Sequence, residues 1–187
     1  MNAFLGFIGL LGVIILAAGV LFIIYGISVT NSFSRKLVKI DEALSGIEVA
    51  LTKRYDTLTK MVDTAKGYTS HELNTLLSVI SMRKGMTVPE LTTEANKMSE
   101  AVSRVNVLAE AYPELRSNTV FEELEKGIRD TEEQLQAARR LYNANVSSYN
   151  QQLLVFPSSI IAHMRGLTKR DFFEAEEYKR ADVKIEF

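Results

Sequence analysis

The stretch AFLGFIGLLGVIILAAGVLFIIYGISV, residues 3–29, decides the first part of the fold, because it contains no charged side chain. The whole of residues 1–34 is uncharged, and the first charge is Arg35. As an α-helix this run would be about 40 Å long, at 1.5 Å per residue. That length exceeds the roughly 30 Å hydrocarbon core of a bilayer. We therefore predict that residues 1–34 form a single-pass transmembrane anchor.

A cleaved signal peptide is the alternative to an anchor. Such a peptide has Lys or Arg before an apolar run of about 7–15 residues, whereas only Met1 and Asn2 precede this longer run. Arg35, Lys36 and Lys39 follow the apolar run directly. Because basic residues favour the cytoplasmic side, we expect the N-terminus outside and the C-terminal domain in the cytoplasm.

Three glycines in the apolar run recur every seven residues, at Gly12, Gly19 and Gly26. Seven residues are close to two helical turns, so these glycines lie nearly on one stripe. Small residues on one face let helices pack closely within lipid, which predicts self-association. The alternative is that glycine is simply common in membrane helices.

A heptad pattern follows the anchor and predicts a helical bundle in residues 35–166. The apolar positions between residues 37 and 68 are spaced alternately by three and four residues, as in one seam of a long helix. Similar seams predict helices at 73–85 and 88–112 and a last long helix from 119 to Pro157, with Gly67, Pro113 and Pro157 as stops. The fold class is therefore all-α, with an antiparallel long-helix bundle of the four-helix type. Possible capping boxes begin at Thr69, Thr87 and Thr119.

Arg54 interrupts the first apolar seam, and Asn145 interrupts the last. A buried unpaired arginine would be costly, so Arg54 either extends outward or meets a carboxylate. The candidate partners are Asp56, Asp63 or an acidic residue of another helix. We favour a role in fixing the register of the helices over a binding role.

The stretch RRLYNANVSSYNQQLLVFP, residues 139–157, repeats a Tyr-Asn pair after seven residues. Tyr142 and Tyr149 both lie on the seam, where their rings would fill the core and their hydroxyls reach polar partners. Asn143 and Asn150 flank the seam, so packing is favoured over chemistry. The charged tail, residues 167–187, ends in alternating VKIEF. This tail is predicted to be extended or amphipathic, with the alternation forming an extended segment or an edge strand that needs a docking surface.

Composition excludes several classes of function. The 187 residues carry a net charge of −1, with no long-range field to attract nucleic acid. Cysteine is absent and only two histidines are present, so a metal site is not expected, and nothing indicates a cofactor. His71-Glu72 is the pairing closest to a catalytic one, but it lacks a second metal-ligand histidine and a visible nucleophile. We expect a non-enzymatic protein and keep a hydrolase using His71 and Glu72 as a minor alternative.

Six stretches share their order with one bacterial family. They are KRYDTLTKMVDTAKGYTSHE (53–72), AEAYPEL (109–115), ARRLYNANVSSYN (138–150), FPSSIIA (156–162), FFEAEE (172–177) and VKIEF (183–187). With the N-terminal apolar helix, they make the chain resemble the LemA family of bacterial membrane proteins. The resemblance implies an anchor in the bacterial inner membrane and a mostly antiparallel helical bundle in the cytoplasm. It also implies no established enzymatic activity. One departure is TLTKM (57–61), where the family usually has Leu-Ile-Pro-Asn-Leu, so the first helix should be more continuous here.

The family's repeated Arg-Tyr-Asp, Gly-Tyr and Tyr-Asn elements fall on residues that we expect in a bundle or subunit interface. With Phe156, these are Arg54, Tyr55, Asp56, Tyr68, Tyr142, Asn143, Tyr149 and Asn150. The expected function is a membrane-anchored scaffold or membrane-organising protein that forms a homo-oligomer in contact with lipid. The alternative is a signalling adaptor that recruits an unknown soluble protein through its bundle or tail.

Overall fold

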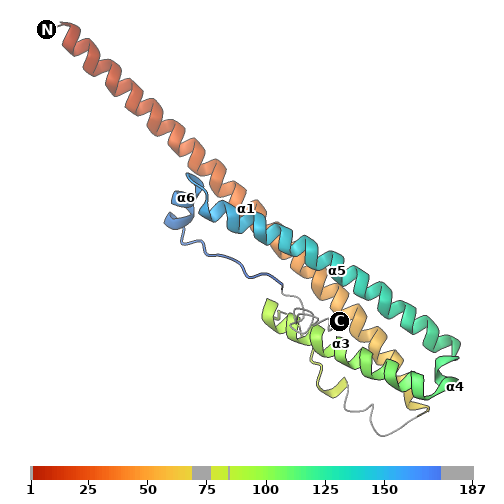
Figure 1. The fold of residues 1–187 in the computed structure, drawn as a ribbon. Coiled ribbons are helices and arrows are strands. Elements are labelled where there is room, and N and C mark those ends of the chain that lie inside the picture. The colour runs from red at the N-terminus through yellow and green to blue at the C-terminus, as the bar shows by residue number, and fades with distance from the viewer. Residues whose placement is uncertain (1, 69–76, 84, 174–187) are drawn as a thin grey trace, which may run out of the picture. The chain divides into compact units, whose positions relative to one another are not determined.

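The computed structural model describes the backbone of residues 2–68, 77–83 and 85–173, and the side chains of these ranges from residue 9 onward. The described chain forms helices and no strand, which confirms the all-α prediction. Figure 1 shows these helices in order: α1 (Asn2–Lys66), α3 (Val88–Ala111), α4 (Pro113–Arg116), α5 (Thr119–Leu154) and α6 (Ser158–Met164). The alternating residues 183–187 lie outside the described part.

Helix α1 is unbroken over 65 residues, so the apolar run and the first heptad seam belong to one helix. Neither Pro nor a charged residue interrupts its first half, and TLTKM replaces the family's proline-containing sequence in its second half. The helix ends at Lys66, directly before the predicted stop at Gly67. Part of α1 is long and apolar enough to cross a membrane, and none of that part is buried.

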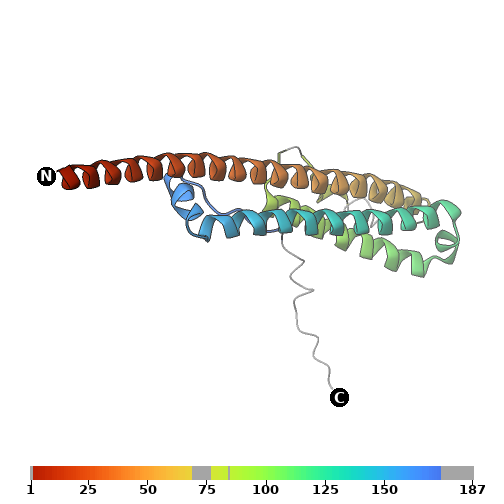
Figure 2. The ribbon, with the colours of Figure 1, turned by 90° about the horizontal axis from the view of Figure 1, so that it is seen from above.

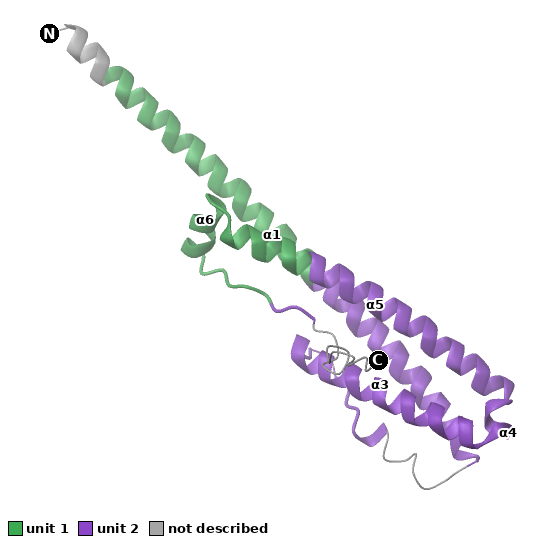
Figure 3. Ribbon diagram, in the orientation of Figure 1, with its two compact units in different colours: residues 1–40, 145–170 green, residues 41–144, 171–187 purple. Residues whose placement is uncertain are grey.

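The chain divides into two compact units, shown in Figure 3. Unit 1 contains residues 1–40 and 145–170, and unit 2 contains residues 41–144 and 171–187. Helices α1 and α5 each contribute to both units. The division predicted from the sequence, at residues 34 and 166, is a division by function and stays a prediction.

Unit 2 is built from three long helical segments, which lie side by side in Figures 1 and 2. Lys53 on α1 bonds to Gln134 on α5, while Tyr68 after α1 bonds to Asn118 before α5. Residues later in α1 thus contact residues earlier in α5, so these two helices are antiparallel. Helix α3 runs in the same direction as the second half of α1, as Figure 1 shows. The core is filled by apolar seam residues, including Ile47, Leu51, Leu58, Leu91, Met98, Phe121 and Leu135.

Unit 1 pairs the middle of α1 with the end of α5. The Phe33 and Tyr149 rings meet edge to face, with centroids 5.8 Å apart, a favoured aromatic geometry. Asn145 Nδ2 donates to the Lys39 carbonyl at 3.1 Å, and Ser32 Oγ donates to Gln152 Oε1 at 3.2 Å. This part of the antiparallel pair is therefore joined by buried rings and by polar contacts beside them.

A sharp turn at Pro157 joins α5 to α6. The Ser158 hydroxyl lies 2.7 Å from the carbonyl oxygens of both Gln152 and Val155, and so satisfies exposed acceptors at the end of α5. Gly166, with φ of 62°, ends α6 in a Schellman motif, in which Leu167 N–H donates to the Ala162 carbonyl. The predicted stop at Pro157 is confirmed, and the short helix α6 follows it.

The three predicted capping boxes have different outcomes. The box at Thr87 is confirmed, since Thr87 N–H donates to Glu90 Oε2 at 2.7 Å. The box at Thr119 is wrong, because Asn118 Oδ1 accepts the Val120 and Phe121 N–H groups and is the cap. Asparagine is the stronger capping residue of the two. The box at Thr69 lies outside the described residues. Of the helix predicted at 73–85, residues 73–76 and 84 also lie outside them, residues 77 and 78 are helical, and residues 79–83 are not, so this prediction is wrong beyond Ser78.

Candidate functional site

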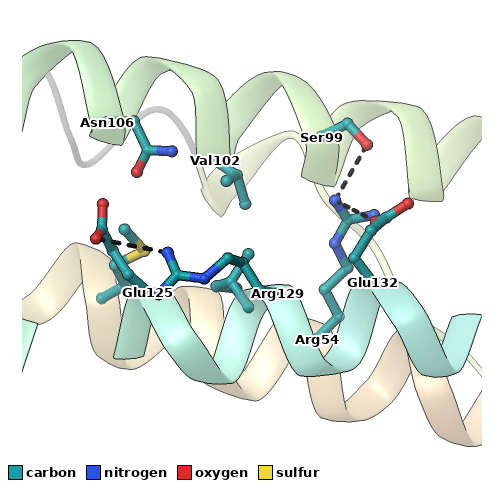
Figure 4. Close-up of a pocket in the computed structure, with 9 residues that line it drawn as sticks. Arg54, Ser99, Val102, Asn106, Glu125, Arg129 and Glu132 are labelled. Atoms are coloured by element: carbon teal, nitrogen blue, oxygen red, sulfur yellow. Dashed lines mark hydrogen bonds and ion pairs between the residues drawn. The ribbon is translucent and has the colours of Figure 1, made fainter. Parts of the chain in front are cut away.

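Arg54 is the most buried charged group among the described residues of unit 2, with 4% of its surface exposed. Its Nη2 atom lies 2.9 Å from Glu132 Oε2 on α5 and 3.2 Å from Ser99 Oγ on α3. Figure 4 shows the guanidinium between these two side chains, so one arginine links α1, α3 and α5. Of the partners expected for Arg54, the structure shows an acidic residue of another helix.

A cavity of about 290 Å³ lies beside the Arg54 guanidinium, in the space shown in Figure 4. Nε and Nη1 of Arg54 are buried and have no hydrogen-bond partner among the described groups. A second ion pair, Arg129 with Glu125, lies at the same cavity with 3.8 Å between its charged atoms. The cavity is therefore lined by two positive and two negative groups that compensate each other. This balanced set favours fixing three helices in register over holding a charged ligand.

Three other residues of the Arg-Tyr-Asp and Gly-Tyr elements lie apart from this cavity. Asp56 is exposed on the other side of α1, in a shallow hollow with Lys53 and Arg83. Tyr55 is half-buried. The Tyr68 hydroxyl accepts a hydrogen bond from Asn118 Nδ2 at 3.2 Å, which joins the end of α1 to the cap of α5. The structure thus separates Arg54 from its sequence neighbours.

In unit 2, Asn143 binds both backbone groups of Phe173. Asn143 Nδ2 donates to the Phe173 carbonyl at 3.0 Å, and Phe173 N–H donates to Asn143 Oδ1 at 2.8 Å. The Tyr142 hydroxyl donates to the Asp171 carbonyl at 3.0 Å. The Phe173 ring is buried below the Arg139 guanidinium, 4.7 Å from its centroid, which is a cation–π contact. This Tyr-Asn pair therefore holds the first part of the tail.

In unit 1, the second Tyr-Asn pair repeats the backbone contact. Asn150 Nδ2 donates to the Arg170 carbonyl at 2.9 Å, and Arg170 N–H donates to Asn150 Oδ1 at 2.9 Å. Tyr149 is 2% exposed, and burial raises the pKa of its hydroxyl, while the positive charge of Arg170 acts in the opposite direction. Both asparagines thus present an amide to the tail backbone, and both tyrosines lie in the core.

The seven-residue spacing of the two asparagines suits an extended chain. Seven residues advance a helix by about 10.5 Å, and three residues advance an extended chain by about 10 Å. Side-chain amides that are seven residues apart on a helix can therefore bond to backbone peptides that are three residues apart on an extended chain. We name residues 167–173, which include the two residues bound by these amides, Arg170 and Phe173, the strap.

The predicted membrane-packing glycines fall into two groups. A Cβ atom at Gly12 or Gly19 would meet no other atom within 4 Å, so both face open space. A Cβ atom at Gly26 would lie 3.7 Å from Ile161 Cδ1, so α6 covers this glycine. Phe156, which we expected in an interface, is 76% exposed at the turn before α6. Whether Gly12, Gly19 and Phe156 meet a second subunit stays a prediction.

The sequence model of the LemA family matches residues 43–187 of the chain, more than half of its length. The chain belongs to the LemA family. The LemA match includes Arg54, both Tyr-Asn pairs and the whole strap. The chain is also 28% identical to a protein LemA of Metamycoplasma hominis over 177 residues, which cover 90% of this chain and 79% of that protein. These comparisons confirm the resemblance drawn from the six sequence stretches.

Sequence reasoning missed two features that this LemA chain places at its sites. The first is Arg139, an apparently ordinary basic residue that is 8% exposed because the Phe173 ring covers it. The second is the pairing of Asn143 and Asn150 with the strap. Their partners are backbone groups, which every residue type carries, so no residue in the tail signals the contact. No group of three or more potential metal ligands occurs among the described residues.

Proposed function

We propose that this protein is a membrane-anchored helical scaffold that assembles into a homo-oligomer and carries out no catalysis. The observation that carries this proposal is the surface of α1. Its first half exposes a continuous set of large apolar side chains, among them Leu10, Val13, Leu16, Leu21, Ile23 and Ile27, each at least 48% exposed. At about 25 cal/mol per Å², such a surface is strongly unfavourable in water. It therefore needs lipid or a second copy of the chain.

Packing within unit 1 favours a retained anchor over a cleaved signal peptide. Val29 and Phe33, which end and follow the apolar run, are buried in the core of unit 1. Ile161 of α6 lies against the backbone at Gly26. Cleavage near the end of the apolar run would remove the surface on which α6 packs. We accordingly place residues 1–34 in the bacterial inner membrane, with the rest of the chain in the cytoplasm.

The open glycines support self-assembly in the membrane. Gly12 and Gly19 lie on one stripe with no neighbour, so a second helix would approach closely there. The bundle supports a scaffold rather than an enzyme, because the buried Arg54 is paired with Glu132 of another helix. Their proposed role is to fix the register of α1, α3 and α5.

Substitution of Gly19 tests the assembly. Gly19→Leu would keep the helix apolar and block close approach on the stripe, whereas Ala17→Leu adds a similar side chain on nearly the opposite face. We expect Gly19→Leu in the full-length chain to shift detergent-solubilised protein to smaller species, and Ala17→Leu to leave its size unchanged. Equal sizes for both variants and the wild type would argue against the glycine stripe, and a monomeric wild type would overturn the assembly.

A signalling adaptor is the second candidate, and the strap favours it. Thr168, Lys169, Arg170, Asp171 and Phe172 are all exposed while the chain around them is held by backbone contacts. A partner would therefore find their side chains accessible. Deletion of residues 167–187 should then abolish capture of that partner and leave assembly intact. Partner capture that survives the deletion would count against an adaptor role for the tail.

A further inference from the structure

Unit 1 has a set of exposed apolar side chains that do not belong to its buried core. It is formed by Leu154 at the end of α5, by Val155 and Phe156 in the turn before α6, and by Ile160 and Met164 on α6, with exposures from 41% to 76%. The other side of α6 is buried through Ile161 and Ala162. These five side chains thus project from the face of the turn and of α6 that lies away from the core. We name this set the apolar turn.

The apolar turn lies beside the end of the apolar run of α1. Ile161 Cδ1 on α6 lies 3.7 Å from the position that a Cβ atom would take at Gly26, and Gly26 lies three residues before the end of residues 3–29. Ile23, Ile24 and Ile27 around that glycine are themselves more than half exposed. The apolar surface of α1 therefore reaches the level at which α6 packs. A bilayer that receives residues 3–29 reaches that level as well.

The first charge on α1 sets the depth of this level. Gly26 precedes Arg35 by nine residues, which is about 14 Å along a helix. The headgroup layer on one side of a bilayer is only about 5–8 Å thick. With Arg35 at or outside the headgroups, Gly26 and the side chain packed on it lie near the boundary between headgroups and acyl chains. Tyr25 next to Gly26 is of the type enriched at this boundary.

Unit 1 and unit 2 differ in net charge. Unit 1 contains no acidic residue, and its six basic residues are Arg35, Lys36, Lys39, Arg165, Lys169 and Arg170. Unit 2 holds the other 16 basic residues and all 23 acidic residues. The near-neutral chain thus combines a positive unit 1, which contains the anchor, with a negative unit 2. A positive surface beside the anchor complements anionic lipid headgroups, at about 1 kcal/mol per basic residue near the surface.

From this position, exposure and charge, we propose that the apolar turn inserts into the headgroup–acyl boundary of the bilayer that holds α1. The inference rests on the membrane anchor proposed above and adds a second point of contact. Leu154, Val155, Phe156, Ile160 and Met164 enter the outer acyl region. Arg165 and Lys169, which follow α6 directly, contact anionic headgroups. Such an arrangement is typical of interfacial segments with an apolar face and basic flanks.

The absence of native cysteine allows a direct test with single labels on the full-length protein. Four variants receive the same environment-sensitive fluorophore: Phe156→Cys and Met164→Cys in the apolar turn, Leu21→Cys in the anchor, and Val107→Cys on α3. All four side chains are exposed, so the labels do not disturb a core. Each protein is reconstituted into vesicles of phosphatidylcholine and phosphatidylglycerol, with and without lipids brominated near the headgroup end of the acyl chain.

We expect brominated lipid to quench the labels at 156 and 164 at least about half as strongly as at 21, because interfacial segments reach 5–10 Å into this boundary. Val107 should show no quenching. Quenching at 21 without quenching at 156 and 164 would overturn the inserted turn and leave the anchor standing. Absence of quenching at 21 would overturn the anchor and the inserted turn together. The label at 21 therefore distinguishes the two failures.

A contact between two copies of the chain is the competing outcome. In that case labels at 156 and 164 would quench each other in fully labelled protein, the effect would vanish on dilution with unlabelled protein, and brominated lipid would have no effect. This result would overturn the proposal in favour of a protein interface. Quenching by brominated lipid that persists after dilution with unlabelled protein supports it.

Discussion

Asn143 pairs with both backbone polar groups of Phe173, thirty residues later in the chain. The amide nitrogen donates at 3.0 Å, and the amide oxygen accepts at 2.8 Å. This is the bonding that a neighbouring β-strand would offer, supplied here by a helix side chain. The irregular backbone of the strap thereby has hydrogen-bond partners, although the described part of the protein contains no strand to provide them.

Removing the Asn143 amide should release the strap. Asn143→Ala loses two hydrogen bonds of about 0.5–1.5 kcal/mol each. We expect faster hydrogen exchange at the Phe173 amide and little change in the core of α5. Asn143→Asp keeps the acceptor and loses the donor, so its effect should be intermediate. Gln151→Ala, on the exposed side of the same helix, is the control, and equal protection in Asn143→Ala and the control would contradict the contact.

Loss of Glu132 should cost more than loss of the whole ion pair. Glu132→Ala leaves Arg54 buried without a carboxylate, which costs up to about 3–5 kcal/mol for a fully buried pair. Glu132 is 31% exposed, so we expect roughly 2 kcal/mol in urea unfolding of the detergent-solubilised protein. The double variant Arg54→Leu/Glu132→Leu should recover most of this loss. A double variant that is less stable than Glu132→Ala would argue against a register role.

The capping box at Thr87 should be sensitive to acid. The pKa of Glu90 is lowered from its ordinary value of 4.5, first by the Thr87 backbone N–H, then by the Thr87 hydroxyl, with a smaller contribution from Arg83. Because the folded pKa is the lower one, the carboxylate contributes stability above pH 4.5 that is lost as pH falls through the folded pKa. The protection factors for hydrogen exchange in the first turn of α3, each relative to intrinsic exchange at the same pH, should therefore fall at acid pH.

In Glu90→Gln this acid dependence should be weaker, because glutamine does not titrate. Glu110→Gln, an exposed change in the last turn of the same helix, is the matched control and should keep the wild-type dependence. An acid dependence in Glu90→Gln as steep as in the wild type would show that another group is responsible.

Two glycines inside long helices should respond differently to alanine. Gly46 on α1 has no atom near its would-be Cβ, so Gly46→Ala should stabilise the protein by about 0.5–1 kcal/mol. Gly127 on α5 faces Thr57 Cγ2 at 3.2 Å from the would-be Cβ. This crowding should cancel part or all of the gain in Gly127→Ala. Thermal unfolding of both variants measures the difference, and an equal gain would contradict the close crossing of α1 and α5.

The sequence predicts the helices well because burial follows the spacing of apolar residues. Leu51, Leu58 and Met61 on the first seam are fully buried, as are Leu91 and Leu135 on the later ones. The ends of helices could also be predicted from the sequence, since Gly67 and Pro113 break helices for local reasons. Local chemistry was misjudged at Thr119, where the stronger cap Asn118 stands one residue earlier.

Contacts between distant parts of the chain could not be read in the same way. Arg54 required an acidic partner on grounds of burial, but several carboxylates satisfied that requirement equally, and Glu132 was not distinguishable among them. The parallel course of α1 and α3 depends on where α3 begins beside α1, which periodicity does not report. The contact of Ile161 with Gly26 depends on the turn at Pro157, whose direction is set by packing and not by spacing.

Native mass spectrometry of the full-length protein, released from detergent, tests the central claim most directly, because one spectrum reports both chain mass and copy number. We expect assemblies of two or more copies in which every chain has the full mass of 21.0 kDa and so retains α1 from its beginning. Single chains at all concentrations, or chains that lack residues 1–34, would contradict a membrane-anchored, self-assembling scaffold.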